Sequence, residues 1–317
     1  MKKEVSVVLP TIGRLEYLDL AIESLLNQEV QFDEIIVFDN SVEQNLSKIS
    51  KFRDNDSIIW RKSGKQLNAI DSWNTAVRLA TKDYVTIMGD DDILCSHFNK
   101  EVHKYLAYGY KMILLPFSYF DEKGDTLSLL QTSNLFESIS SELFRKNRVL
   151  CKFGLMIPGV VFKKNHFEQV DGFTDTRFPS KMFADELLWF KISFLVKEIG
   201  CSNTICWNYR VHKGQTVNVI DADSFIKNSD NYVDLLLFYM KKFNIKESEI
   251  LPNNLSFEEY KNKFIVKNYY INTQMACFKK KLWRQFLINF YSLLKNSNIN
   301  KFELISIHFK QLLKVLS

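Results

Sequence analysis

The sequence predicts an α/β protein built on a parallel, doubly wound sheet. Short apolar strands alternate with amphipathic helices over residues 5–94, and the connections between them are short, a pattern typical of such sheets. Polar clusters follow three of the strands, at residues 11–14, 39–41 and 90–92. Because these sheets bind ligands beyond the carboxyl ends of their strands, the three clusters predict a binding site at one edge of the sheet.

Hydrophobic periodicity predicts each element in this first part of the chain. The strands are short apolar runs, and the helices repeat apolar side chains at three- and four-residue spacing. In chain order we expect a strand at 5–9, a helix at 16–28, a strand at 34–38, a helical stretch at 46–52, a strand at 58–60, a helix through Ile70, Trp73, Val77 and Ala80, and a strand at 84–88.

The chain beyond the fourth strand has a less regular pattern. From about Ser224 glycine is absent and the pattern becomes helical and amphipathic. The sequence therefore predicts a first domain over residues 1–220 and a helical, basic region over residues 221–317. Between the fourth strand and residue 220 we expect a strand at 112–117, a turn at 121–126, an apolar run at 160–162, a loop at 171–179, a buried helix at 184–196 and an extended segment at 204–211.

Composition and cysteine content narrow the class of protein. The chain has 317 residues, 46% of them apolar and 25% charged, which is ordinary for a globular protein with a large core. Its five cysteines include no Cys-x-x-Cys pair, so neither a disulfide framework nor a zinc site is indicated, and a reducing cytosol is expected. No apolar stretch has the length of a signal peptide or a membrane span, so we expect a cytoplasmic protein.

Positive charge is concentrated near the C-terminus. Residues 261–317 contain eleven Lys or Arg and one acid, whereas residues 1–260 contain 31 basic and 36 acidic side chains. Lysine and aromatic side chains lie together there, as in a basic amphipathic helix that rests on anionic lipid at the inner face of the cell membrane. A helical subdomain with its lysines in solvent explains the same pattern, and both interpretations stay open. The lysine and aromatic residues concerned are Lys279, Lys280, Lys281, Trp283, Phe286 and Phe290.

No nucleic-acid-binding motif is present, so we expect no nucleic-acid partner.

Three consecutive carboxylates, Asp90, Asp91 and Asp92, follow Gly89 at the end of the fourth predicted strand. Like charges so close repel one another, and a divalent cation relieves the repulsion by binding the carboxylate oxygens. The alternative is a solvated acidic turn, because Gly and Asp are common in turns. The position beside two other polar strand ends favours a site for a divalent cation.

Taken in order, these segments resemble the family 2 glycosyltransferases. The resemblance covers about residues 4–215 and leaves the C-terminal hundred residues out. It implies the GT-A fold, with a mostly parallel central sheet flanked by helices and followed here by a C-terminal helical extension. It also implies a nucleotide-sugar donor, a divalent cation (Mg²⁺ or Mn²⁺) and transfer with inversion at C1 of the sugar. It rests on Val5-Ser-Val-Val-Leu-Pro-Thr, the strand ending in Asp39-Asn40-Ser41, Asn74, Gly89-Asp-Asp-Asp-Ile-Leu and Ala184-Asp-Glu-Leu-Leu-Trp.

The resemblance assigns the nucleotide to the ends of the first strands. It implies that Pro10, Thr11 and Arg14 flank the base and ribose, and that Asp39 hydrogen-bonds one of them. The alternative for Asp39 is an Asx-turn that closes the strand. Asn68 falls where some relatives carry an Arg near the base, which leaves the choice of base open.

For the metal, the resemblance implies that Asp91 is a ligand, that Asp90 lies near the ribose or diphosphate, and that Asp92 supports the site, as a ligand or behind one. Many relatives carry Asp in place of Gly89, and the usual Asp-x-Asp spacing is available here as Asp90 and Asp92. The division of roles within the triplet therefore stays open. His212 matches a His that relatives often place near the metal or diphosphate, and a structural role is its alternative.

Asp185 matches the catalytic base of the family, with Glu186 as the neighbouring alternative. A carboxylate that takes the proton of the acceptor hydroxyl in the transition state contributes about 10²–10⁴-fold to the rate. Asp185 also fits a helix N-cap, and a carboxylate at the start of a helix can serve both purposes.

The function expected from the resemblance is inverting, metal-dependent transfer of a sugar from a nucleotide-sugar. We expect a UDP-sugar as donor and a hydroxyl of a glycan or lipid-linked acceptor, in bacterial surface polysaccharide synthesis. Acceptor pockets are expected from the loops at residues 115–132 and 134–159.

Two other functions remain open from the sequence. A nucleotidyltransferase of sugar phosphates should carry a Gly-rich basic loop after the first strand, where residues 10–14 offer one Gly and one Arg. A non-catalytic sugar-binding relative should lack the acidic triplet or Asp185, and this chain has both.

Overall fold

The chain forms two compact units, which are described separately. The first contains residues 1–148, 152–175 and 184–212, and the second contains residues 149–151, 176–183 and 213–317. Every candidate site residue belongs to the first unit, and the predicted domain boundary near residue 220 stays a prediction. The computed structural model describes residues 3–42, 45–121, 126–129, 137–149, 158–173, 183–212, 222–251, 255–256, 259–260, 291, 301–302 and 305.

Several predictions fall wholly or largely outside the described residues. They are the tip of the turn at 121–126, most of the loop at 171–179, large parts of the two acceptor loops, and the basic amphipathic segment around Lys279.

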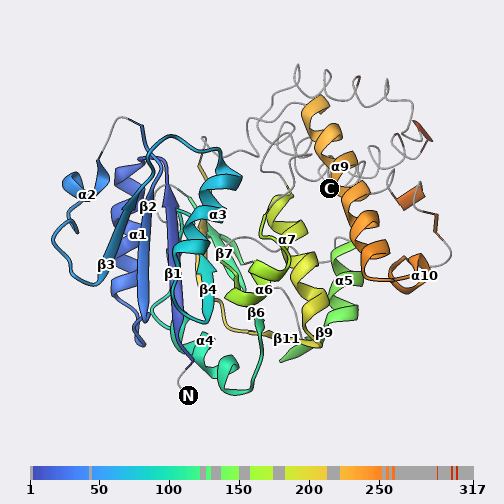
Figure 1. The fold of residues 1–317 in the computed structure, drawn as a ribbon, viewed down its shortest axis with the longest axis horizontal. Coiled ribbons are helices and arrows are strands. Elements are labelled where there is room, and N and C mark those ends of the chain that lie inside the picture. Colours follow the sequence, from blue (N-terminus) through green and yellow to red (C-terminus); the bar gives the residue numbers. More distant parts are fainter. Residues whose placement is uncertain are drawn as a thin grey trace. The chain divides into compact units, whose positions relative to one another are not determined.

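The first four strands form the parallel part of an eight-stranded sheet, as predicted. β1 (Val5–Thr11) pairs in parallel with β2 (Glu34–Asp39) on one side and with β4 (Tyr84–Ile87) on the other. β3 (Ile58–Lys62) extends the sheet beyond β2. Figure 1 shows these strands side by side with their helices around them. The carboxyl ends of β1, β2 and β4 therefore meet at one edge.

The sheet beyond β4 is mixed, so the sheet as a whole is mostly parallel, as the resemblance implies. β10 (Val160–Lys163) lies antiparallel between β4 and β6 (Met112–Leu114). β11 (Glu198–Cys201) is parallel to β6, and β9 (Ser138–Ser140) is antiparallel to β11. The apolar run at 160–162 was predicted, but hydrophobic periodicity carries no information about strand direction. Only a parallel pair requires a crossover between its strands.

Helices cover both faces of the large sheet, as a doubly wound fold requires. Alternate residues of β1 point to opposite faces, so Val7 packs with α1 (Leu15–Leu26) and α4 (Phe98–Ala107), whereas Val8 packs with α3 (Ala69–Leu79) and α7 (Ala184–Ile192). Of these four helices, α4 was not predicted. The remaining short helices of this part are α2 (Leu46–Ile49), α5 (Ser141–Val149), α6 (Lys164–Gln169) and the 3₁₀ turn Ser193–Leu195.

A second, four-stranded sheet was not predicted from the sequence. Its order is β5 (Ile93–Leu94), β12 (Trp207–Arg210), β7 (Phe117–Phe120) and β8 (Thr126–Leu129). The single strand predicted at 112–117 is in fact β6 and β7, separated at Pro116, which has no backbone N–H to donate to a ladder. Antiparallel pairing of β12 with β5 brings the end of β12 beside the acidic triplet.

The second unit contains a long amphipathic helix, α9 (Ala222–Lys242), and the short α10 (Glu247–Ile250). The helical pattern predicted from Ser224 is therefore confirmed in this part. Val233, Leu236 and Met240 are buried at helical spacing along α9, and Phe183 stacks on Tyr232 with ring centroids 5.1 Å apart. Within the described part of the chain, every helix is too short or too polar to cross a bilayer.

Candidate active site

The strand-end clusters of β1 and β4 meet as the sequence predicts. Thr11 lies at the end of β1, and its Oγ1 donates a hydrogen bond of 2.5 Å to Oδ2 of Asp90, which follows β4. The same Oγ1 accepts a 3.2 Å bond from the backbone N–H of Gly13, whose φ of 111° favours a residue without a Cβ. This turn carries the chain from the strand end toward Arg14 at the start of α1.

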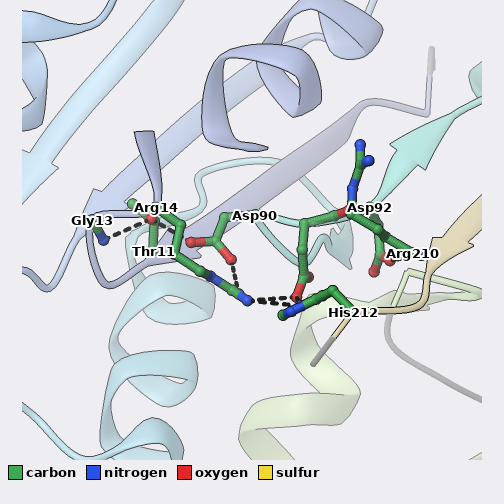
Figure 2. Close-up of polar contacts among 8 residues, drawn as sticks. Thr11, Gly13, Arg14, Asp90, Asp92, Arg210 and His212 are labelled. Atoms are coloured by element: carbon green, nitrogen blue, oxygen red, sulfur yellow. Dashed lines mark hydrogen bonds and ion pairs between the residues drawn. The ribbon is translucent and has the colours of Figure 1, made fainter. Parts of the chain in front are cut away.

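Arg14 lies on the acidic triplet. Its Nη1 is 2.7 Å from Oδ2 of Asp91, and its Nη2 donates to Oδ1 of Asp90. Figure 2 shows the side chain extended from the end of β1 between Asp90 and His212. Burial alone lowers the pKa of Arg14, but the charges and hydrogen bonds of Asp90 and Asp91 outweigh it and raise that pKa.

The three carboxylates of the triplet are not equivalent. Burial raises the pKa of Asp90 and raises that of Asp92 well above its usual value, in the second case with help from the charge of Asp91. Burial also acts to raise the pKa of Asp91, but the charge of Arg14 and a hydrogen bond with His212 leave that pKa lowered. Asp91 is therefore the carboxylate best held in its ionised form, whereas Asp92 accepts a 3.2 Å bond from the backbone N–H of Arg210.

Two residues at and just after the end of β12, Arg210 and His212, also contact the acidic triplet. Nε of Arg210 donates a 2.8 Å bond to the backbone oxygen of Asp91, and the guanidinium lies over the rings of Tyr17 and Phe120, 4.9 and 4.4 Å from their centroids. Nε2 of His212 lies 2.9 Å from Oδ2 of Asp91. His212 is thus brought to the triplet as predicted. Tyr17, a helix residue without a motif, was not among the predicted site residues.

Asp39 is satisfied entirely by protein groups. Its Oδ1 accepts from the backbone N–H and the hydroxyl of Ser41, at 2.9 and 2.5 Å, and its Oδ2 accepts from Leu46 N at 3.1 Å and Lys62 Nζ at 3.0 Å. Burial acts to raise the pKa of Asp39, but these bonds lower it. The Asx-turn that the sequence left open is present, and a role toward the base or ribose stays a prediction. Lys62 was missed because its pairing with Asp39 depends on the β2–β3 register.

Asn40 and Asn68 fix the segment that leads into α3. The side-chain amide of Asn40 accepts from Leu67 N at 2.8 Å and donates to Leu67 O at 2.9 Å. Asn68 caps α3 by accepting from Asp71 N at 2.9 Å. Pro10 lies within β1 opposite Phe38 of β2. Asn68 and Pro10 therefore lie at the same sheet edge as Asp39, although neither contact identifies a base.

Asp185 and Glu186 begin α7 and have different surroundings. Glu186 forms an ion pair with Arg148, whose side chain is 5% exposed. Asp185 is half-buried, and its charge adds to burial and to the charges of Asp92 and Asp91 in raising the pKa of Tyr209. Asp185 thus lies close enough to act on the same phenol as the triplet. The pairing of Glu186 favours Asp185 as the base, a role that stays a prediction.

Asn74 and Trp73 pack against the turn that ends at Phe173. Oδ1 of Asn74 accepts a 2.9 Å bond from Phe173 N, and the rings of Trp73 and Phe173 lie 5.3 Å apart. Gly172 adopts a φ of 57°, and a Cβ there would collide with Asn74 and Phe167. The contacts of these two side chains are structural.

The side chains at the triplet fit a divalent cation that takes most of its ligands from a substrate. Among the described residues, no three His, Cys, Asp or Glu side chains gather as a complete metal site. Mg²⁺ is nevertheless usually held by one or two carboxylates together with phosphate oxygens and water. Asp91 and His212 provide a carboxylate and an imidazole at one point, so they are the residues that would hold the ion once Arg14 leaves Asp91.

Comparison with known families and proteins supports the same assignment. The model of the family described as Glycosyl transferase family 2 matches residues 6–164. The uncharacterised glycosyltransferase MJ1057 of Methanocaldococcus jannaschii is 29% identical over 53% of this chain, and the chain spans only 60% of its length. The GalNAc(5)-diNAcBac-PP-undecaprenol beta-1,3-glucosyltransferase of Campylobacter jejuni is 27% identical over 93% of this chain and 89% of its own.

Solved structures share the fold at low sequence identity. S. aureus TarS residues 1–349 in complex with UDP matches with a TM-score of 0.59 and 16% identity, covering 88% of this chain and 75% of TarS 1–349. The complex of the same protein with UDP-GlcNAc gives a TM-score of 0.58 and 15% identity over 90% and 79% of the two chains. The family match covers half of the sequence and the predicted fold is observed, so this chain belongs to glycosyltransferase family 2 and is a glycosyltransferase with the GT-A fold.

Proposed function

We propose that this enzyme transfers a sugar from a UDP-sugar, with inversion at C1 and with Mg²⁺ or Mn²⁺, to a hydroxyl of a glycan or lipid-linked acceptor. The observation that carries the proposal is the convergence of Thr11, Arg14, the acidic triplet and His212 at the carboxyl edge of the sheet. Solved relatives bind UDP and UDP-GlcNAc, and one relative is named as a glucosyltransferase of an undecaprenol-diphosphate-linked glycan.

The leaving group of such a reaction is a nucleoside diphosphate with several negative charges. When bound, the cation acts as a Lewis acid on the diphosphate oxygens and eases departure. Asp91 and His212 would hold that ion, and Arg14 offers two parallel N–H donors suited to a phosphate. Thr11 fixes Asp90 behind them through the 2.5 Å hydrogen bond.

The acceptor hydroxyl attacks C1 of the sugar from the face opposite the diphosphate, which gives inversion. The new bond joins the acceptor oxygen to C1 while the bond from C1 to the phosphate oxygen breaks. The electron pair of the broken bond leaves with UDP, and the proton of the acceptor passes to Asp185. Glu186 stays paired with Arg148 and holds the first turn of α7 in place.

The other end of the donor would lie against the turn after β2. Asp39, Asn40 and Asn68 form a rigid frame there because each is fixed by hydrogen bonds to the backbone. We propose that this frame receives the base and ribose. Uracil is the base that the UDP complexes of the solved relatives support.

A lipid-linked acceptor would place the enzyme at the inner face of the cell membrane. The basic composition of residues 261–317, with eleven Lys or Arg and one acid, supports contact with an anionic surface. The alternative function, a nucleotidyltransferase of sugar phosphates, is not supported, because the family match is to glycosyltransferases and the loop at 10–14 is not Gly-rich.

The function is tested with a panel of UDP-, GDP- and dTDP-sugars and Mn²⁺. A donor that binds only the folded protein raises its melting temperature, and the UDP-sugars are expected to give the largest rise. Transfer to an undecaprenol-diphosphate-linked or free glycan, followed by NMR of the product, should show the anomeric configuration opposite to that of the donor. Binding of no nucleotide-sugar in the panel, or a product that retains the donor configuration, would contradict the proposal.

A further inference from the structure

One carboxylate oxygen of Asp91 and two side-chain nitrogens, from Arg14 and His212, lie within hydrogen-bonding distance of one another. Oδ2 of Asp91 lies 2.7 Å from Nη1 of Arg14 and 2.9 Å from Nε2 of His212, and these two nitrogens lie 3.2 Å apart. A guanidinium nitrogen only donates, whereas one imidazole nitrogen either donates or accepts. If Nε2 carries the proton, both nitrogens donate to the same oxygen of Asp91. If Nε2 carries no proton, it can accept from Arg14. In both arrangements Arg14 occupies the oxygen that faces His212.

Protein encloses most of this contact. The side chains of His212 and Asp90 are 6% and 3% exposed, and that of Asp91 is 18% exposed. Arg14 is the accessible member, at 34%, and its buried Nε has no hydrogen-bond partner among the described residues. Arg14 is therefore held through its two terminal nitrogens and is the member of the cluster most easily moved.

A divalent cation and Arg14 are alternative occupants of the same point. The cation would take a lone pair of Asp91 Oδ2 and the lone pair of His212 Nε2, and it would repel a guanidinium 2.7 Å from that oxygen. When Arg14 leaves, Asp90 keeps the hydrogen bond from Thr11. A diphosphate beside the cation offers Arg14 a new anionic partner with matching two-pronged geometry.

We propose that Arg14 is a built-in competitor of the metal, which occupies Asp90 and Asp91 in the donor-free enzyme and moves to the diphosphate when cation and donor bind. This rests on the proposed function, since it takes a nucleoside diphosphate and a divalent cation as the ligands. Its consequence is that free metal binds weakly and that metal and donor strengthen each other's binding.

The test measures Mn²⁺ binding directly, by the EPR signal of free Mn²⁺, without nucleotide and with saturating UDP. In the wild type we expect UDP to tighten Mn²⁺ binding about tenfold or more, within the range typical of coupled sites. Arg14→Gln removes the competing charge, so it should bind Mn²⁺ alone about tenfold more tightly and should gain less from UDP. UDP itself should bind the variant more weakly, because its diphosphate loses a partner.

Lys51→Gln provides the matched control, because it removes one positive charge from a surface pair with Glu23 at 2.7 Å and should leave Mn²⁺ binding unchanged. If Arg14→Gln does not fold, as judged by circular dichroism, Arg14→Lys replaces it. A lysine keeps the positive charge but lacks the two-pronged geometry of the guanidinium, so a smaller gain in Mn²⁺ affinity is expected.

Two outcomes separate this inference from the proposed function. A wild type that binds Mn²⁺ and UDP, with a folded Arg14 variant that binds Mn²⁺ no more tightly, overturns the competition and leaves the glycosyltransferase mechanism intact. A wild type that binds neither ligand overturns both.

Discussion

The two ends of the candidate donor site are built in different ways. At the base end, Asp39, Asn40 and Asn68 have partners whose donor and acceptor roles agree, so this end is already formed without ligand. At the metal end, Arg14 contacts both Asp90 and Asp91 and is the more exposed partner, at 34%. From this difference we propose that a donor is received on a rigid frame at its nucleoside and that the protein rearranges where its diphosphate arrives.

The largest expected effect is on the rate of sugar transfer, and not on ligand binding at either end of the donor site. Asp185→Asn removes the base, so the transfer rate should fall by about 10²–10⁴-fold, whereas binding of UDP and Mn²⁺ should stay unchanged. Single-turnover kinetics and titration calorimetry measure the two quantities. Glu186→Gln is the matched control. Because Glu186 pairs with Arg148, this change should lower the melting temperature and should leave the transfer rate nearly unchanged. Normal transfer by Asp185→Asn would remove the base assignment.

The next effect concerns the metal end alone. Asp91→Asn removes the charge of a proposed metal ligand, so it should weaken Mn²⁺-dependent UDP binding by about a hundredfold or more, because changing even a group behind a ligand costs about 10–100-fold. Uridine, which has no phosphate, should bind the variant and the wild type equally. Calorimetry with each ligand measures both affinities. An equal loss for uridine would mean that the two ends are not independent.

A smaller effect is expected at the base end. Asp39→Asn weakens the bonds from Leu46 and Lys62 to a buried group, so the free energy of unfolding should fall by about 1–3 kcal/mol. Uridine binding should weaken as well, and Mn²⁺ binding should not change. Denaturant unfolding and the same calorimetry provide the measurements. A variant with wild-type stability would show that the turn does not depend on the Asp39 charge.

The smallest effect depends on pH. The pKa of Asp39 is lowered in the folded protein, so its contribution to stability is present above the ordinary value of 3.8 and is lost as the pH falls through the lower, folded value. Lys62→Gln weakens one cause of that shift and should cost less than about 1 kcal/mol, because Lys62 is 38% exposed. Acid unfolding of the variant should therefore begin at a slightly higher pH than that of the wild type. Identical acid transitions would exclude a contribution from this pair.

The sequence was sufficient for the parts of the molecule that depend on local pattern. The first four strands, most of their helices and the meeting of Thr11 with Asp90 follow from periodicity and from the rule that parallel strand ends share one edge. The placement of His212 beside the triplet was carried by family resemblance, and the structure provides its physical basis in the pairing of β12 with β5.

Features that depend on contacts between distant segments could not be predicted. The direction of β10 and the second sheet are set by pairings between strands far apart in the chain. The pairs of Lys62 with Asp39 and Arg148 with Glu186 join residues 23 and 38 positions apart. No local pattern specifies which of many surface cations finds a given carboxylate.

The comparison between the two ends is tested most directly by titrating UDP and uridine into the wild-type enzyme with and without Mn²⁺. We predict that Mn²⁺ strengthens UDP binding about tenfold or more and leaves uridine binding unchanged. Equal affinities for UDP with and without Mn²⁺, or an equal response of uridine, would contradict the account of a rigid nucleoside frame beside a metal-dependent diphosphate site.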